Sequence, residues 1–216
     1  MSEATRDLLP RVKVCGLTTA EDVALALDAG ADACGFVHHP PSPRSVPLEE
    51  LARLASAVRG EARSVLVLVD ADPAEVSQLV RGCGIDLVQL CGDERPEDWR
   101  DSGLALLRRL PAEPGAGSEL ERWRGIATGF VIDHPSSPGG SGRGVDVELA
   151  ASFCREAPCL LAGGLGADNV AERIARVRPA GVDAASRLEA SPGRKNTQLT
   201  RDYVRHALRA LRELPA

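Results

Sequence analysis

The sequence has few aromatic residues, no long apolar run and no excess of positive charge. Only 3% of its 216 residues are aromatic, and the formal net charge is -5. A surface that binds nucleic acid needs a basic face, usually with aromatic side chains for stacking, so we expect no nucleic-acid partner. No apolar segment approaches the length that spans a bilayer, so we expect no membrane partner either.

Patterns that mark secretion or metal binding are also missing. The first ten residues, Met1 to Pro10, lack the apolar centre of a secretory signal, which predicts a cytoplasmic protein. The six cysteines include no CxxC pair and no Cys/His cluster with zinc spacing, so in a reducing compartment they are most simply free thiols. We interpret the pair His38-His39 as polarity at the rim of a site, because no third metal ligand accompanies it.

What the sequence does contain is a regular alternation of short apolar runs with amphipathic stretches. This alternation is typical of parallel strands joined by crossover helices. The predicted strands are Val12 to Cys15, Ala33 to Val37, Ser64 to Val69, Leu87 to Leu90, Ala105 to Leu110, Gly129 to Ile132, Cys159 to Ala162 and Gly181 to Ala184. The predicted helices are Thr19 to Ala29, Leu48 to Val58, Pro73 to Arg81, Arg95 to Ser102, Glu119 to Trp123, Asp146 to Arg155, Asp168 to Val177 and Thr197 to Leu211.

Residues suited to helix starts support several of these helices. Thr18 and Glu21 have the spacing of a capping box, and Asp72 precedes Pro73 where a cap and a first-turn proline are favoured. Asp168 also stands where a cap or first-turn residue is wanted.

The number of strand-helix units favours a closed barrel. Eight units in about 200 residues fit the lower end of the size range of the α/β class of (β/α)₈ TIM barrels. The rival architecture, an open doubly wound sheet, should carry G-x-G-x-x-G after its first strand, and neither this motif nor a P-loop is present. We therefore predict a single barrel domain over residues 1–216, with residues 1–10 as a flexible N-terminal extension.

Two strand ends carry side chains suited to proton transfer. Cys15 ends the first predicted strand, and Asp133 directly follows the sixth. If these strands are parallel and share one opening, a thiol and a carboxyl group can act as base and acid on one small substrate. The alternatives are a cysteine that fills the core and an aspartate that stabilises a turn.

Glycines gather late in the chain, near the ends of the last three strands. They occur at Gly139 to Gly144, in Ala162-Gly163-Gly164-Leu165 and within Ser186 to Gly193. Barrels that bind phosphorylated substrates often hold the phosphate at the loops after strands seven and eight, where backbone N–H groups face the anion. The alternative is that these glycines form ordinary tight turns.

Together these segments resemble the phosphoribosylanthranilate isomerases of tryptophan biosynthesis. The similarity extends from about residue 11 to the last helix, with the motifs in family order. They are Arg11-Val-Lys-Val-Cys-Gly-Leu-Thr18, Gly30-Ala-Asp-Ala-Cys-Gly-Phe-Val37, Ser42-Pro-Arg44, Val88-Gln-Leu-Cys-Gly-Asp-Glu94, Asp133 with Gly139-Gly-Ser-Gly142, Ala162-Gly-Gly-Leu165 with Asp168-Asn-Val170, and Val182-Asp183 through Pro192-Gly193-Arg-Lys195. The family fold is a (β/α)₈ barrel, in agreement with the unit count.

The resemblance implies a function and a set of site residues. The reaction would be an Amadori rearrangement of N-(5-phosphoribosyl)anthranilate, a phosphorylated small molecule, without cofactor or metal. Asp133 would be the acid and Cys15 the base. Arg44 would hold the anthranilate carboxylate, and Asp183 would lie near the sugar hydroxyls. The other expected substrate-binding residues are Gly142, Gly163, Gly164, Ser186 and Arg187, and the expected oligomeric state is a monomer or a homodimer.

Three residues depart from the family pattern. Cys91 replaces a histidine that faces the site, Arg187 replaces a glycine of the phosphate loop, and Asn196 replaces an aspartate. Arg187 can either add a charge-assisted phosphate contact or close the pocket. Two alternatives therefore stand beside the standard isomerase: a diverged isomerase acting on a related phosphoribosyl arylamine in a specialised pathway, and a barrel that binds a sugar phosphate without turnover.

Overall fold

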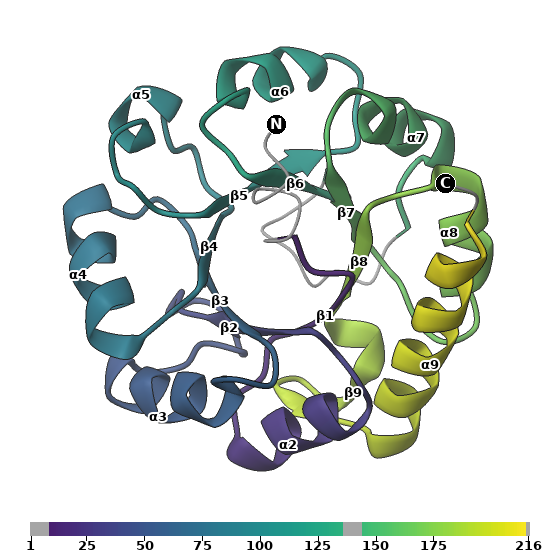
Figure 1. Ribbon diagram of the computed structural model, residues 1–216, viewed down its shortest axis with the longest axis horizontal. Coiled ribbons are helices and arrows are strands. Elements are labelled where there is room, and N and C mark those ends of the chain that lie inside the picture. Colours follow the sequence, from purple (N-terminus) through teal and green to yellow (C-terminus); the bar gives the residue numbers. More distant parts are fainter. Residues whose placement is uncertain (1–8, 136–143, 215–216) are drawn as a thin grey trace.

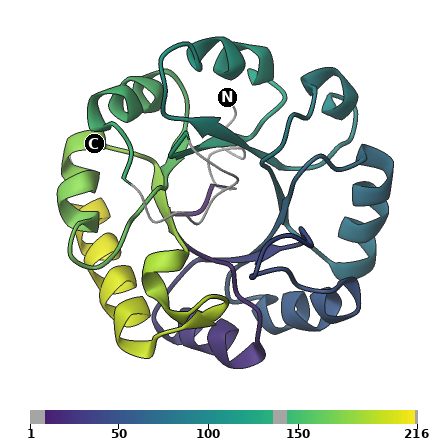
Figure 2. The same cartoon turned by 180° about the vertical axis from the view of Figure 1, so that it is seen from behind.

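Eight parallel strands form a closed barrel in the computed structural model, which describes residues 9–135 and 144–214. Each strand pairs with the next in chain order, and β1 pairs with β8 to close the barrel. Helices surround the barrel on all sides (Figures 1 and 2). The predicted (β/α)₈ fold is confirmed, and the open doubly wound sheet is excluded.

The elements lie close to their predicted positions. The barrel strands are β1 Val12–Cys15, β2 Ala33–Val37, β3 Arg63–Leu68, β4 Leu87–Leu90, β5 Leu106–Pro111, β6 Gly129–Asp133, β7 Cys159–Leu161 and β8 Gly181–Ala184. The helices are α2 Ala20–Asp28, α3 Leu48–Val58, α4 Pro73–Cys83, α5 Pro96–Trp99, α6 Gly117–Trp123, α7 Val147–Glu156, α8 Val170–Val177 and α9 Thr197–Glu213. The chain also forms a short 3₁₀ helix, η1 Ser186–Leu188, and a small hairpin of β9 Glu189–Ser191 and β10 Arg194–Lys195, which were not predicted.

Helix capping agrees with prediction at α4 but not at α2. The Asp72 side chain accepts hydrogen bonds from the backbone N–H groups of Ala74 and Glu75, with Pro73 in the first turn. At α2 the cap is Thr19, so the prediction of Thr18 is wrong by one residue. The reason is that the Thr18 hydroxyl donates instead to the carbonyl of Gly193, 2.6 Å away.

Asp168 is likewise not a helix cap. Helix α8 begins after Asn169, whose amide bridges the preceding turn by accepting from Gly166 N–H and donating to the Gly164 carbonyl. The Asp168 carboxylate pairs with Arg187, with 2.8 Å between Oδ2 and Nη2. Asp168, which was predicted at the start of the helix, therefore instead forms an ion pair with a residue of η1, the short helix after β8.

Strand alternation divides the apolar core into two parts. Outward-facing residues such as Val12 and Val14 pack against the helices. The inward-facing apolar cluster consists of Leu9, Ala33, Val65, Leu87, Leu107, Val131, Leu160 and Ala162. Leu9 belongs to this interior and Pro10 is buried, whereas the rest of the predicted N-terminal extension, residues 1–8, lies outside the described residues.

Three polar side chains share the barrel interior with the apolar cluster. Lys13 is fully buried, and Gln89 and Asp183 are 5% and 7% exposed. Lys13 points inward because it alternates with the outward-facing Val12 and Val14 on β1, and the same alternation turns Cys15 inward one step further along the strand. The barrel interior is therefore polar on the side where β1 and β8 meet.

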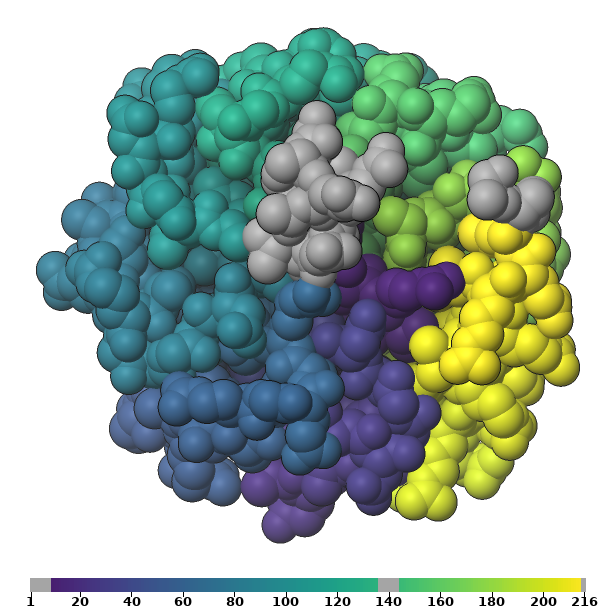
Figure 3. All heavy atoms as spheres, in the orientation of Figure 1, coloured from purple at the N-terminus to yellow at the C-terminus, as the bar shows by residue number. Residues whose placement is uncertain are grey.

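The space-filling view shows where the first and last described segments lie. The N-terminal part of the described chain lies next to α9, the last helix (Figure 3). Helix α9 packs against α8 and α2, and also contacts β1. Within the described residues, no helix combines the length and apolar character needed to span a bilayer.

Gly35 provides the space that Lys13 and Cys15 occupy inside the barrel. A Cβ atom built on Gly35 would lie 2.7 Å from Cys15 Sγ and 3.0 Å from Lys13 Cε. We expect Gly35→Ala to lower the free energy of unfolding by about 1–3 kcal/mol through overpacking. Denaturant unfolding measures this change. The control is Gly82→Ala on the exposed surface of α4, where nothing lies within 4 Å and alanine should stabilise the helix by about 0.5–1 kcal/mol. Equal effects of the two substitutions would contradict the packing argument.

Candidate active site

One pocket at the carboxyl ends of the strands brings together the predicted site residues. Its empty volume is about 840 Å³, including the open mouth. Eight predicted residues line it: Cys15, Arg44, Asp133, Gly163, Gly164, Asp183, Ser186 and Arg187. Gly142 lies outside the described residues. Because parallel strands end at the same face of a barrel, residues that are far apart in the sequence meet here.

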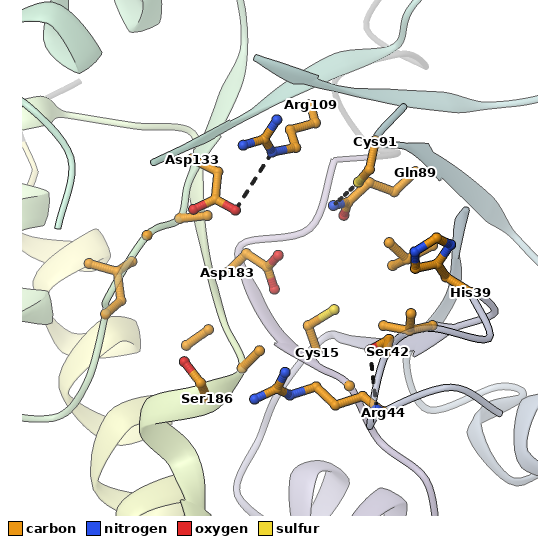
Figure 4. A pocket seen from close by; sticks show the side chains of 18 of the residues that line it. Cys15, His39, Ser42, Arg44, Gln89, Cys91, Arg109, Asp133, Asp183 and Ser186 are labelled. Atoms are coloured by element: carbon orange, nitrogen blue, oxygen red, sulfur yellow. Dashed lines mark hydrogen bonds and ion pairs between the residues drawn. The ribbon is translucent and has the colours of Figure 1, made fainter. Parts of the chain in front are cut away.

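Cys15 lies at the end of β1 and is 7% exposed. Figure 4 shows its thiol and the carboxyl groups of Asp133 and Asp183 pointing into the same pocket. Burial raises the pKa of Cys15, whereas the ammonium groups of Lys13 and Lys195 act in the opposite direction. The thiol therefore has the position of a base, and nearby cations favour its charged form.

Asp133 ends β6 on another side of the pocket. One carboxylate oxygen, Oδ1, accepts a hydrogen bond of 2.7 Å from the His134 backbone N–H, and Arg109 Nε lies 3.9 Å from Oδ2. Burial raises the pKa of Asp133, although the His134 N–H and the Arg109 charge oppose this shift. A raised pKa keeps part of the carboxyl group protonated at higher pH, as a proton donor requires.

Arg44 is held beside Cys15 by a carboxylate that lies 145 residues later in the chain. Its Nε and Nη2 atoms donate to the two oxygens of Glu189 at 2.7 and 2.8 Å. The Arg44 side chain crosses Gly16, where an added Cβ would lie 2.7 Å from Arg44 Cδ. Glu189 also accepts from Lys195 Nζ at 3.1 Å. This bidentate contact fixes the plane of the guanidinium group at the rim of the pocket.

The two carboxylate oxygens of Asp183 have different environments. Oδ2 forms an ion pair of 2.8 Å with Lys13 Nζ. Oδ1 is buried and has no hydrogen-bond partner among the described residues. Buried carboxylate oxygens normally have partners, so Oδ1 can accept a hydrogen bond from a ligand hydroxyl.

The loop after β7 follows a path that only glycine adopts readily. Gly163 and Gly164 have φ angles of 78° and 65°, in the left-handed region. Ser186 and Arg187 face this loop from η1, after β8. The Arg187 guanidinium donates to the Gly164 carbonyl at 3.1 Å and to Asp168 at 2.8 Å. The Arg187 side chain thus lies against the loop that follows β7, and its hydrogen bonds are to residues of that loop.

Cys91 occupies the pocket wall after β4. The Gln89 side-chain amide donates to its sulfur at 3.3 Å, and burial raises the pKa of Cys91 to about 12. Cys91 is therefore a neutral thiol at physiological pH. It cannot supply the charge of an imidazolium in this position.

Four further polar residues belong to the site, although the sequence analysis gave them no role. Lys13, Gln89 and Arg109 lie on the inward-facing positions of strands β1, β4 and β5, and strand alternation from Cys15 and Cys91 could have identified the first two. Glu189 contacts Arg44 from 145 residues away, and no local pattern indicates that contact.

The fold and the pocket together define a (β/α)₈-barrel enzyme with acid-base groups at the carboxyl ends of its strands. The sequence model of the N-(5'-phosphoribosyl)anthranilate (PRA) isomerase family matches residues 12–206. The chain belongs to this family.

Individual relatives show the same similarity. The N-(5'-phosphoribosyl)anthranilate isomerase of Rubrobacter xylanophilus is 40% identical, over 91% of this chain and 98% of the relative. That of Pelobacter propionicus is 37% identical, over 91% of this chain and 95% of the relative. The crystal structure of phosphoribosyl anthranilate isomerase from Thermotoga maritima has a TM-score of 0.84 at 27% identity, and covers 93% of this chain and 99% of its own.

A further solved structure contains a ligand. It is phosphoribosyl anthranilate isomerase in complex with reduced 1-(o-carboxyphenylamino)-1-deoxyribulose 5-phosphate, with a TM-score of 0.82 and 26% identity over 93% of this chain and 99% of its own. That protein binds a phosphorylated arylamino sugar.

Proposed function

We propose that this protein isomerises N-(5-phosphoribosyl)anthranilate to 1-(2-carboxyphenylamino)-1-deoxyribulose 5-phosphate, with Asp133 as general acid and Cys15 as general base. The observation that carries the proposal is that Cys15 and Asp133, from strands β1 and β6, line one pocket whose far wall is the glycine loop after β7. Membership of the isomerase family and the ligand bound by a solved relative support the same reaction.

The chemistry requires one proton donor and one proton acceptor. Asp133 protonates the ribose ring oxygen, the bond from this oxygen to C1′ breaks, and the nitrogen lone pair forms an iminium ion. The Cys15 thiolate then removes the C2′ proton, and the electron pair neutralises the iminium to give an enolamine. Transfer of a proton from O2′ to C1′ gives the ketone. The site resets when one proton returns, through solvent, from the Cys15 thiol to the Asp133 carboxylate.

The phosphate is best accommodated at the loops after β7 and β8. Gly163 and Gly164 let the main chain approach an anion closely, and Ser186 begins the short helix that follows β8. This is the place where barrels commonly bind phosphate. With the phosphate there, the sugar lies over Asp183, whose buried Oδ1 accepts a hydroxyl hydrogen bond, and the arylamine faces Arg44.

Arg44 is proposed to bind the anthranilate carboxylate through the nitrogen that Glu189 leaves available. Nη1 makes no hydrogen bond with any part of the chain that the structure describes, whereas Nε and Nη2 are held by Glu189. A guanidinium fixed in this way meets the ligand in one orientation, which reduces the entropy lost on binding.

A direct assay with the purified protein tests the function. We expect N-(5-phosphoribosyl)anthranilate to be consumed, and the gene to restore growth of a tryptophan auxotroph that lacks the isomerase. No turnover together with tight binding of the reduced product analogue would indicate a barrel that binds sugar phosphates without catalysis. No turnover and no binding would favour an isomerase for a related phosphoribosyl arylamine, a possibility raised by Cys91 and Arg187 in the pocket wall.

Arg187 is expected to contribute to phosphate binding after it leaves its contacts in the ligand-free pocket. We expect Arg187→Ala to raise KM about tenfold, equivalent to about 1.4 kcal/mol, with kcat nearly unchanged. Steady-state kinetics at fixed ionic strength measure both constants. The matched variant is Asp168→Asn, which weakens the ion pair that competes for the guanidinium and should lower KM. A lower KM in Arg187→Ala would show instead that this side chain obstructs the pocket.

A further inference from the structure

Lys13 is the most deeply buried charged group of the described barrel. It has no exposed surface and lies beneath the pocket floor. Nζ donates to Asp183 Oδ2 at 2.8 Å and to Gln89 Oε1 at 2.9 Å. Removing an ammonium group from water costs several kcal/mol, and a pair with one carboxylate is weak evidence of a net gain in stability. A lysine in this position therefore calls for an explanation beyond packing.

The neighbour that offers such an explanation is Cys15. Lys13 and Cys15 are two residues apart on β1, so both side chains point into the barrel. Cys15 Sγ and Lys13 Cε lie 2.7 and 3.0 Å from the same point above Gly35, because that glycine leaves the space open. The two side chains therefore share one small volume, closed to solvent on the Lys13 side.

The charges around the thiol come from three strands and from the loop after β2. Lys13 on β1 and Lys195 on β10 lower the pKa of Cys15, whereas Asp183 on β8 raises it; Arg44, after β2, also interacts with the thiol. Burial is the largest influence and disfavours the thiolate, and Lys13 is the strongest opposing group. The other titratable groups that interact with this thiol are Cys34, Cys91 and Tyr203. Burial raises the pKa of each of them, which keeps them neutral near pH 7.

We propose that Lys13 is a positioning residue whose buried ammonium group stabilises the thiolate of Cys15. The proposal deepens the function proposed above, since it explains how a buried thiol can serve as the base in that reaction. Lys13 is not among the described residues that line the pocket, so its role would be exercised through Cys15. Gln89 and Asp183 hold the ammonium group in place, and Gly35 keeps the space between the two side chains free.

The ligand-free protein allows a direct test. The rate at which iodoacetamide alkylates Cys15 is measured against pH by peptide-resolved mass spectrometry, because the thiolate is the reactive form. In Lys13→Met the profile should move to higher pH by about one unit or more, so that alkylation at pH 8 slows about tenfold. Cys83, a half-buried thiol on α4, is the internal control, and its profile should stay unchanged.

The opposite substitution separates charge from structural damage. Asp183→Asn removes the carboxylate that disfavours the thiolate, so Cys15 alkylation should move to lower pH. Loss of packing would move both variants in the same direction. If Lys13→Met does not fold, the double variant Lys13→Met/Asp183→Asn leaves no unpaired buried charge. Its Cys15 alkylation profile should still lie at higher pH than that of the wild type. The proposal would be overturned if the alkylation profile of a folded Lys13→Met protein, or of the double variant, stayed at the wild-type pH or moved to lower pH.

Kinetics distinguish this inference from the proposed function. If Cys15 is the base, the basic limb of the kcat/KM profile should move together with the alkylation profile in Lys13→Met. A shifted alkylation profile with an unmoved limb would sustain the effect of Lys13 on the thiol and reject Cys15 as the base.

Discussion

Cys15→Ala should lower kcat by about 10²- to 10⁴-fold and leave KM nearly unchanged. The reason is that the thiolate is needed only when the C2′ proton is removed, whereas the phosphate, the hydroxyls and the carboxylate are bound by other residues. Steady-state turnover of N-(5-phosphoribosyl)anthranilate gives both constants. A thermal unfolding curve shows whether the variant retains its fold.

A second buried cysteine provides the control for this substitution. Cys34 lies on β2, where it pairs with Val14, the residue before Cys15, and it faces outward into the apolar layer beneath the helices. Cys34→Ala should affect stability and leave turnover at the wild-type level. Near-wild-type turnover in Cys15→Ala would remove this thiol from the mechanism.

Asp133→Asn should have an effect of similar size, about 10²- to 10⁴-fold on kcat, because an amide cannot donate the proton that opens the ribose ring. The substitution keeps the size of the side chain. It also keeps an oxygen that can accept the hydrogen bond from the His134 N–H. The control is Asp101→Asn, at an exposed aspartate after α5, which should leave kcat unchanged. An equal response of the two variants would contradict a specific role for Asp133.

The pH dependence gives Asp133 a second signature. The active form has a protonated Asp133 and a deprotonated Cys15, and burial raises the pKa of both groups from values near 3.8 and 9.0. Below the pKa of the carboxyl group the thiolate becomes scarcer while the acid is already saturated, so kcat/KM falls. Above the pKa of the thiol the protonated acid becomes scarcer, so kcat/KM falls again. The profile should be a bell. In Asp133→Asn the fall at high pH should disappear, and the residual rate should rise with pH until the thiol is ionised. A fall at high pH that persists in this variant would assign that limb to another group.

The sequence predicted the barrel well because each strand-helix unit carries its own local signal. All eight strands were placed within one residue at each end, since apolar runs bounded by glycine and polar residues mark strands that are buried on both faces. Helix starts were less well predicted. The Thr18 hydroxyl bonds to the distant Gly193, so Thr19 caps α2 instead, and the local sequence does not distinguish these two threonines.

The residues of the candidate site that lie at strand ends could be predicted from the sequence. Cys15 and Asp133 follow directly from the positions where strands β1 and β6 stop. The contacts between Arg44 and Glu189, and between Lys13 and Asp183, join residues 145 and 170 positions apart. Such pairs arise only from the closure of the barrel, and no local pattern in one sequence encodes them.

The hairpin of β9 and β10 has a consequence for how the protein acquires activity. Residues of this hairpin bond to the early part of the chain. The Gly193 carbonyl accepts from the Thr18 hydroxyl, Lys195 N–H donates to Asp22, and Glu189 accepts from Arg44. The hairpin thus contacts residues that lie 145 to 175 positions earlier in the chain. Contacts of such high sequence separation form slowly. A nascent or C-terminally truncated chain should therefore hold most of its secondary structure while its catalytic centre is still unassembled.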